Sequence, residues 1–122
     1  MRALDAYQRR IRRGPAIVAG DFNIDPTGSE ERSGAWFTRL VERLGRLGLR
    51  SAYHAHLGEP FGAETRPTYF HYRHRERPFH IDFCFVSDPL LERVRHVEVG
   101  LYDDWVGAGL SDHVPVTVDF DE

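Results

Sequence analysis

Three short polar segments carry the side chains in this sequence that could do chemistry. Segment 20–23 reads GDFN, so Asp21 and Asn23 stand two residues apart and point the same way in an extended chain. Segment 80–82 reads HID and places Asp82 inside an otherwise apolar run, and segment 111–116 reads SDHVPV and joins Asp112 to His113. Carboxylates, an amide and an imidazole are the groups that activate water, hold a hard metal ion or stabilise an oxyanion.

Each segment taken alone also has a purely structural interpretation. Asp21 and Asn23 are typical of an Asx turn that ends a strand, because both side chains bond readily to nearby backbone. Asp82 could belong to a structural ion pair with an arginine, since a buried carboxylate needs a partner. A neighbouring aspartate and histidine are common in proteins. The functional hypothesis therefore depends on the three segments acting together.

Two helices and an apolar strand make up the first part of the predicted fold. Residues 2–13 have an apolar stripe at helical spacing and end before Gly14-Pro15. Residues 16–19 read AIVA, which indicates a central strand buried on both faces. A second amphipathic helix is expected from an N-cap at Ser33 to a stop at Gly48.

The rest of the chain is expected to form strands, after a short helical piece in residues 51–57. Strands are predicted at 68–72, 81–86, 97–101 and 114–120, and the last two have one apolar and one polar face, as in antiparallel pairs. Helix, strand, helix and then several strands predict an α+β fold. The expected architecture is a mixed, largely antiparallel sheet with helices on one face.

Length and composition describe a globular chain of one domain. The 122 residues are 41% hydrophobic and 29% charged with a net charge of −3, which disfavours disorder and allows a real core. No apolar run is long enough to span a membrane, and no signal peptide opens the chain. The single cysteine, Cys84, cannot form an internal disulfide, so a reducing, cytoplasmic location is expected.

Taken together, the motifs GDFN, IDFCFV and SDHVPV resemble those of the endonuclease/exonuclease/phosphatase family, which has the deoxyribonuclease-I-like fold. Segments 48–53 (GLRSAY) and 68–73 (TYFHYR) also look like family segments, although Ser51 stands where the family usually has aspartate. The resemblance runs from about residue 15 to residue 120. It implies a sheet with helices that forms half of a four-layer αββα sandwich.

The resemblance implies a Mg²⁺-dependent phosphoester hydrolase, with Mn²⁺ as an alternative ion, in which water attacks in line. Asp21 would then bind metal and position or protonate groups at the phosphate, and Asn23 would bond the phosphate or the attacking water. His113 would act as general base or stabilise developing charge, Asp82 would hold its tautomer, and Asp112 would support the metal site.

The resemblance leaves the substrate open among nucleic acids, phosphoinositides and phospholipid head groups. A rim that binds the substrate would include Tyr69, Tyr72, Arg73 and His80, where aromatic rings could stack on bases or head groups. Sheet packing is the alternative explanation for these aromatic residues.

The family domain is usually about twice as long as this chain. Its first half supplies a strand asparagine, a metal-binding glutamate and a tyrosine or histidine near the phosphate, none of which has a position here. The sequence therefore predicts that residues 1–122 are one domain equivalent to the C-terminal portion of the family fold. It also predicts self-association or pairing with an N-terminal half, because a sheet face would otherwise lie uncovered.

Two other functions remain open from the sequence. The chain could be a non-catalytic remnant that binds a phosphate ligand or a partner protein. It could alternatively hold Zn²⁺ through histidines in its central stretch, which contains the pairs His54/His56 and His71/His74 together with His80.

Overall fold

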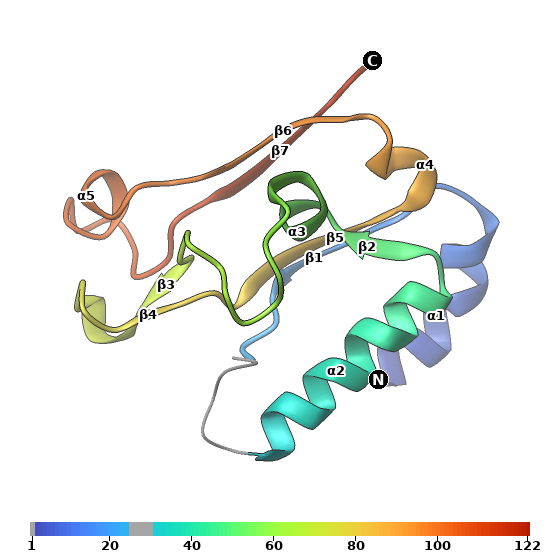
Figure 1. Ribbon diagram of the computed structural model, residues 1–122, viewed down its shortest axis with the longest axis horizontal. Helices are drawn as coiled ribbons and strands as arrows, with labels where there is room; N and C mark the ends of the chain where they lie inside the picture. The colour runs from blue at the N-terminus through green and yellow to red at the C-terminus, as the bar shows by residue number, and fades with distance from the viewer. Residues whose placement is uncertain (1, 25–30) are drawn as a thin grey trace.

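The computed structural model of the chain describes residues 2–24 and 31–122 (Figure 1). The helices are α1 (Arg2–Arg13), α2 (Glu31–Arg46), α3 (Ala52–Leu57), α4 (Asp88–Leu91) and α5 (Tyr102–Trp105), with a 3₁₀ turn η1 (His71–Arg73). The strands are β1 (Ile17–Asp21), β2 (Leu49–Ser51), β3 (Tyr69–Phe70), β4 (Pro78–Phe79), β5 (Asp82–Ser87), β6 (Val94–Val99) and β7 (Val116–Phe120). No helix in the described ranges is both long and apolar enough to cross a bilayer.

Strand β5 is the centre of a three-stranded antiparallel sheet with the order β1-β5-β2. The register pairs Ile17 with Val86 at one end and Asp21 with Asp82 at the other. The end of β1 and the start of β5 therefore place two carboxylates side by side at one end of the strand pair.

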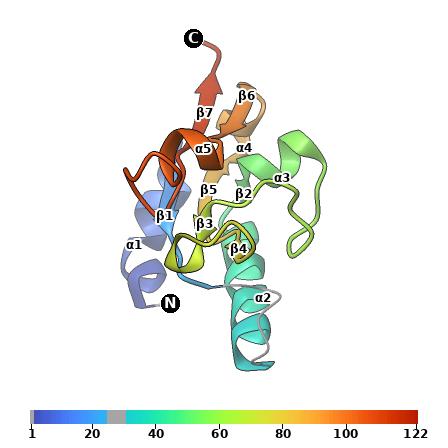
Figure 2. The ribbon, with the colours of Figure 1, turned by 90° about the vertical axis from the view of Figure 1, so that its left-hand side faces the viewer.

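Two further antiparallel pairs bring the last polar motif to the same end of the β1–β5 pair. Strands β3 and β4 form a short hairpin, and β6 pairs with β7. The segment that leads into β7 reaches the hairpin through an isolated bridge between Tyr69 and His113. Figure 2 shows the β3–β4 hairpin next to the lower ends of β1 and β5.

The core lies on both faces of β5, because alternate residues of a strand point to opposite sides. Phe83 and Phe85 pack against Leu4 of α1 and Leu44 of α2 in one buried cluster. Val86 packs on the other face with residues of α3, β6 and β7, in a second cluster. Figure 1 shows α1 and α2 on one side of the three-stranded sheet and the β6–β7 pair on the other. These two contacts hold β5, and with it Asp82, from both sides.

The predicted α+β class with antiparallel pairing is confirmed, and the structure refines its details. The strands form three separate ladders, and the strand pairings among the described residues are all antiparallel. The first two helices share one face as expected, whereas α3 packs on the opposite face. The second helix already begins at Glu31, so Ser33 lies inside it and is not its N-cap.

Two strand predictions were wrong in detail. Strand β1 is not buried on both faces: it pairs only with β5 among the described residues, and Ile17 is 52% exposed. An apolar run indicates burial by some partner, and the described residues supply a partner to one edge and one face of β1. The aromatic strand at 68–72 shortens to β3, because Tyr72 and Arg73 adopt left-handed φ angles of 52° and 61° in η1.

Candidate active site

His113 and Asp82 form the best-defined contact in the polar cluster. Nδ1 of His113 lies 2.9 Å from Oδ2 of Asp82, and the two side chains are 30% and 19% exposed. An ionised carboxylate only accepts hydrogen bonds, so this contact places the ring proton on Nδ1. In the neutral ring of His113 the lone pair is then on Nε2, the nitrogen that does not contact Asp82.

Two further carboxylates surround that nitrogen. Oδ2 of Asp21 lies 3.8 Å and Oδ1 of Asp112 lies 4.0 Å from Nε2 of His113. Both separations are too long for hydrogen bonds and leave room for a bound group between the side chains. The three polar segments that are far apart in sequence therefore converge on one imidazole.

The donor atoms of this cluster fit a divalent cation. Ligand atoms of Asp21, Asp82 and His113 all lie within 4.8 Å of one another. Asp21 and Asp82 are also directly opposite in the strand register, where like charges destabilise a strand pair. A divalent ion with oxygen preference would offset this repulsion, and Mg²⁺ commonly takes one or two carboxylates plus water and phosphate oxygens.

Asn23 acts locally on Asp21 through the backbone. Its N–H donates a hydrogen bond of 2.7 Å to Oδ1 of Asp21, and its φ angle is 53°. This is the Asx turn that the sequence allowed as a structural alternative. The turn occupies Oδ1 and leaves Oδ2 of Asp21 facing His113, while the exposed Asn23 side chain stays at the surface of the site.

Thr68 positions the site, and sequence reasoning did not single it out. It is fully buried, and its Oγ1 accepts hydrogen bonds from the N–H groups of Ile81 (3.1 Å) and Asp82 (3.2 Å). Its carbonyl oxygen accepts from the N–H of Val114 at 2.9 Å. One residue thus ties the backbone beside Asp82 to the backbone beside His113. A threonine within an aromatic, apolar segment was the available signal.

Of the predicted rim residues, the structure brings Tyr69 to the site. The Tyr69 ring lies 4.8 Å from the His113 ring, and its hydroxyl is 2.9 Å from Nδ1 of His71. Tyr72 and Arg73 are exposed in η1, beyond the hairpin strand that carries Tyr69. His80 does not lie at the surface of the cluster, because its side chain is buried and its ring packs against Tyr53 and Phe83.

Comparison with known proteins places this geometry in a family. The model of the endonuclease/exonuclease/phosphatase family matches residues 2–113. The 3′ phosphatase NExo from Neisseria, solved with a product DNA hairpin, is similar to this chain at a TM-score of 0.75 and 26% identity. The 3′–5′ exonuclease NExo from Neisseria meningitidis is similar at a TM-score of 0.73 and 26% identity. Both comparisons cover 98% of this chain and 51% of the other, so this chain spans about half the length of those structures.

No match was found among curated protein sequences. The family match nevertheless covers the first two polar segments that converge in the structure and the third as far as His113. The chain belongs to the endonuclease/exonuclease/phosphatase family.

Proposed function

We propose that this chain supplies one side of the active site of a divalent-metal-dependent phosphoester hydrolase, with a DNA phosphate end as the first substrate to test. The convergence of Asp21, Asp82 and His113 within 4.8 Å is the observation that carries the proposal. The DNA-bound Neisseria structure, similar over 98% of this chain, supports the choice of substrate.

Each side chain of the cluster would have a different role in phosphate hydrolysis. Asp82 holds the proton of His113 on Nδ1, so that Nε2 can accept a proton from water or stabilise charge at the phosphate. Asp21 and Asp112 offer carboxylate oxygens to Mg²⁺ or Mn²⁺, which supplies charge neutralisation at the phosphate when bound. Asn23 and Tyr69 lie where a phosphate or its sugar would enter, and Tyr72 and Arg73 extend the same rim.

Removal of divalent metal should abolish the activity. The expected result is hydrolysis of a 3′-phosphorylated DNA oligonucleotide by the chain with Mg²⁺, and loss of that activity in EDTA with recovery on adding Mg²⁺ or Mn²⁺. The reason is that two opposed carboxylates, without a cation, repel both each other and the phosphate. Phosphate release from the oligonucleotide measures the rate. A phosphodiester substrate run in parallel distinguishes phosphatase from phosphodiesterase activity.

Variants distinguish this activity from contamination. Asp21→Asn should remove the metal-dependent rate, whereas Asp119→Asn, an exposed carboxylate on β7, should leave it unchanged. A rate that survives Asp21→Asn belongs to another protein in the preparation. Complete inactivity of the unaltered chain with both substrates would favour the alternative function, a module that binds a phosphate ligand or a partner.

A specific observation favours partner binding as this second candidate. An apolar groove of about 560 Å³ lies between β7 and the β1–β5 pair, with Ile17, Ala19, Val116 and Phe120 among its lining residues. We propose that a complementary N-terminal half of the family fold covers this groove, because the similar structures contain a further half that this chain does not match.

Without such a half, the chain should self-associate. Light scattering at increasing concentration should show dimers or larger species, and an apolar dye should fluoresce on binding, because exposed apolar patches of this kind promote association. Ile17→Arg should reduce both signals, while Tyr72→Arg, at an exposed position outside the groove, should not. A concentration-independent monomer that binds no dye would exclude this proposal.

A further inference from the structure

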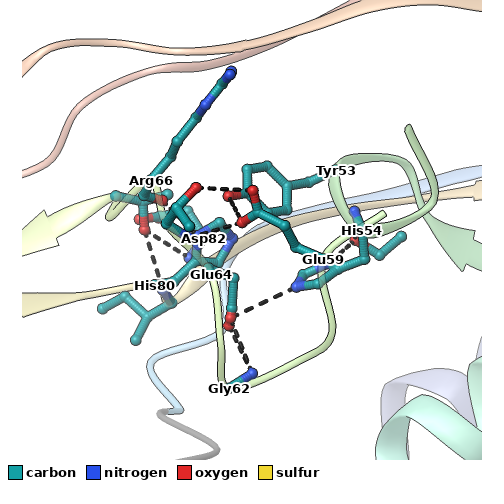
Figure 3. Close-up of polar contacts among 12 residues, drawn as sticks. Tyr53, His54, Glu59, Gly62, Glu64, Arg66, His80 and Asp82 are labelled. Carbon is teal, nitrogen blue, oxygen red and sulfur yellow. Dashed lines mark hydrogen bonds and ion pairs between the residues drawn. The ribbon is translucent and has the colours of Figure 1, made fainter. Parts of the chain in front are cut away.

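A second cluster of chemically capable side chains lies in the protein interior, beside the candidate active site. The connection between α3 and β3 folds back so that Glu64 faces His54 of α3, and His80 lies between β4 and β5 (Figure 3). The His54 and Glu64 side chains are 7% and 3% exposed, and His80 is 7% exposed. One helix and two connecting segments thus contribute two imidazoles and one carboxylate to a part of the interior that is almost inaccessible to solvent.

The hydrogen bonds of His80 leave one ring nitrogen unsatisfied. Its Nδ1 lies 2.8 Å from the carbonyl oxygen of Arg66, and a carbonyl only accepts, so Nδ1 carries the proton. Nε2 of the neutral ring is then a lone pair, and it has no hydrogen-bond partner although it is buried. A metal-ligating histidine has this pattern: one ring N–H donates to a carbonyl and the other nitrogen is free to bind the ion.

His54 lies on the other side of the cluster, and the Ser51 hydroxyl beside its Nδ1 can donate as well as accept, so this contact allows either ring tautomer. Its Nδ1 lies 2.6 Å from Oγ of Ser51, and its Nε2 is also buried without a hydrogen-bond partner. The ring is held in place by stacking on Phe61 at 3.9 Å between centroids. A buried polar atom without a partner is unfavourable, so two such nitrogens in one cluster need an explanation.

Glu64 supplies the charge that such an explanation requires. The Gly62 N–H donates to both carboxylate oxygens, at 2.8 and 3.0 Å. Burial alone would raise the pKa of Glu64, but the contacts with His54 and Gly62 outweigh it and hold the pKa below its ordinary value. The cluster therefore contains one negative charge, the lone pair on Nε2 of His80, and an Nε2 of His54 that can bind an ion when its ring proton is on Nδ1, a set that suits a cation.

The spacing between the donors points to a metal ion as that cation. Oε2 of Glu64 lies 3.7 Å from Nε2 of His54, which is too long for a hydrogen bond. Zinc–ligand bonds of ~2.0–2.2 Å in tetrahedral geometry put two ligand atoms roughly 3.3–3.6 Å apart. The third donor is farther away than in the Asp21 cluster, where all donors lie within 4.8 Å, so the His80 ring must close on the other two. The His54 and His80 ring centroids are 5.6 Å apart, so metal binding at this site requires the two rings to move closer together.

We propose that His54, Glu64 and His80 form a binding site for a transition-metal ion of the Zn²⁺ class, separate from the Mg²⁺-type cluster around His113. Two imidazoles and one carboxylate are a known three-ligand set for zinc, with water as the fourth ligand. A cavity of about 260 Å³, lined by Glu64 and His80 among others, leaves space for that water. The ion would link the connection between α3 and β3 to His80, which lies two residues before Asp82, the first residue of β5.

Competition with a chromophoric zinc chelator tests the proposal on the full chain, in excess Mg²⁺ so that the oxygen-rich cluster is saturated. The unaltered chain should bind one equivalent of Zn²⁺, and Glu64→Gln should weaken binding by about 100-fold or more, since loss of outer-shell groups alone costs 10–100-fold. Glu76→Gln and His56→Gln, at exposed positions, should bind as tightly as the unaltered chain. Asp21→Asn should also keep its zinc, so failure of the hydrolase proposal is distinguishable from failure of this one.

Histidine ring NMR of the unaltered chain tests the proposal even if a variant at one of the buried positions does not fold. In the unaltered chain, Zn²⁺ should shift the Nε2 signals of His54 and His80 first. Three results would overturn the proposal: no zinc binding by the folded chain, unchanged affinity in folded Glu64→Gln, or shifts confined to His113 or the exposed histidines.

Discussion

Replacing His113 by glutamine should lower the Mg²⁺-dependent hydrolysis rate by about 10²–10⁴-fold, the usual contribution of a positioned general acid or base. Glutamine keeps the side chain polar and of similar reach but cannot accept and release a proton near neutral pH. The fold should remain intact, because the His113 side chain is 30% exposed and makes one direct side-chain hydrogen bond, to Asp82. Single-turnover phosphate release, with circular dichroism to check folding, measures the effect.

His96→Gln is the matched control for this variant, since His96 is an exposed imidazole on β6. Its rate should equal that of the unaltered chain. Asp82→Asn should resemble His113→Gln, because an amide that donates to Nδ1 would move the ring proton to Nε2. A fully active, folded His113→Gln variant would mean that the imidazole takes no part in the reaction.

Replacing Thr68 by valine should destabilise the protein by about 2–4 kcal/mol. Valine has nearly the same shape, so the change removes the hydroxyl and leaves the buried N–H of Ile81 and the half-buried N–H of Asp82 without that acceptor. Each such group costs about 1–3 kcal/mol. Urea unfolding, with the free energy extrapolated to zero denaturant, measures the loss.

The same variant should reduce activity in its folded fraction, because Asp82 and the segment before His113 are both tied to Thr68. Thr117→Val on β7 is the control, since Thr117 is exposed and valine suits a strand there. Equal stability of Thr68→Val and Thr117→Val would show that the two hydrogen bonds to the Thr68 hydroxyl contribute nothing measurable.

The polar motifs could be predicted from the sequence because they combine local patterns with a rare order along the chain. The alternation of Phe83 and Phe85 with Asp82 and Cys84 predicts that the two phenylalanines share one face of β5, and both lie in one buried cluster, whereas Cys84 packs against the second cluster on the other face. The strand register then places the carboxylates together, because an antiparallel pairing that aligns the apolar residues of β1 and β5 also brings Asp21 opposite Asp82.

Other parts of the site could not be predicted, because they depend on contacts between distant segments. Nothing local to Thr68 indicates that its hydroxyl bonds to backbone 13 and 14 residues away. Glu64 lies in a connection whose path the sequence does not define, so its approach to His54 appears only in three dimensions. The exposure of β1 reflects the absence of a second neighbour strand among the residues that the structure describes, which an apolar run cannot reveal.

Paramagnetic NMR with Mn²⁺ tests most directly the central claim, that Asp21, Asp82 and His113 form one metal and phosphate site. The measurement follows backbone amide signals of the unaltered chain during titration with substoichiometric Mn²⁺, with and without inorganic phosphate, and does not depend on turnover. We expect the amides of Asp21, Asp82 and His113 to broaden first, and phosphate to strengthen the effect. Preferential broadening elsewhere, or uniform broadening that phosphate and Asp21→Asn leave unchanged, would contradict the claim.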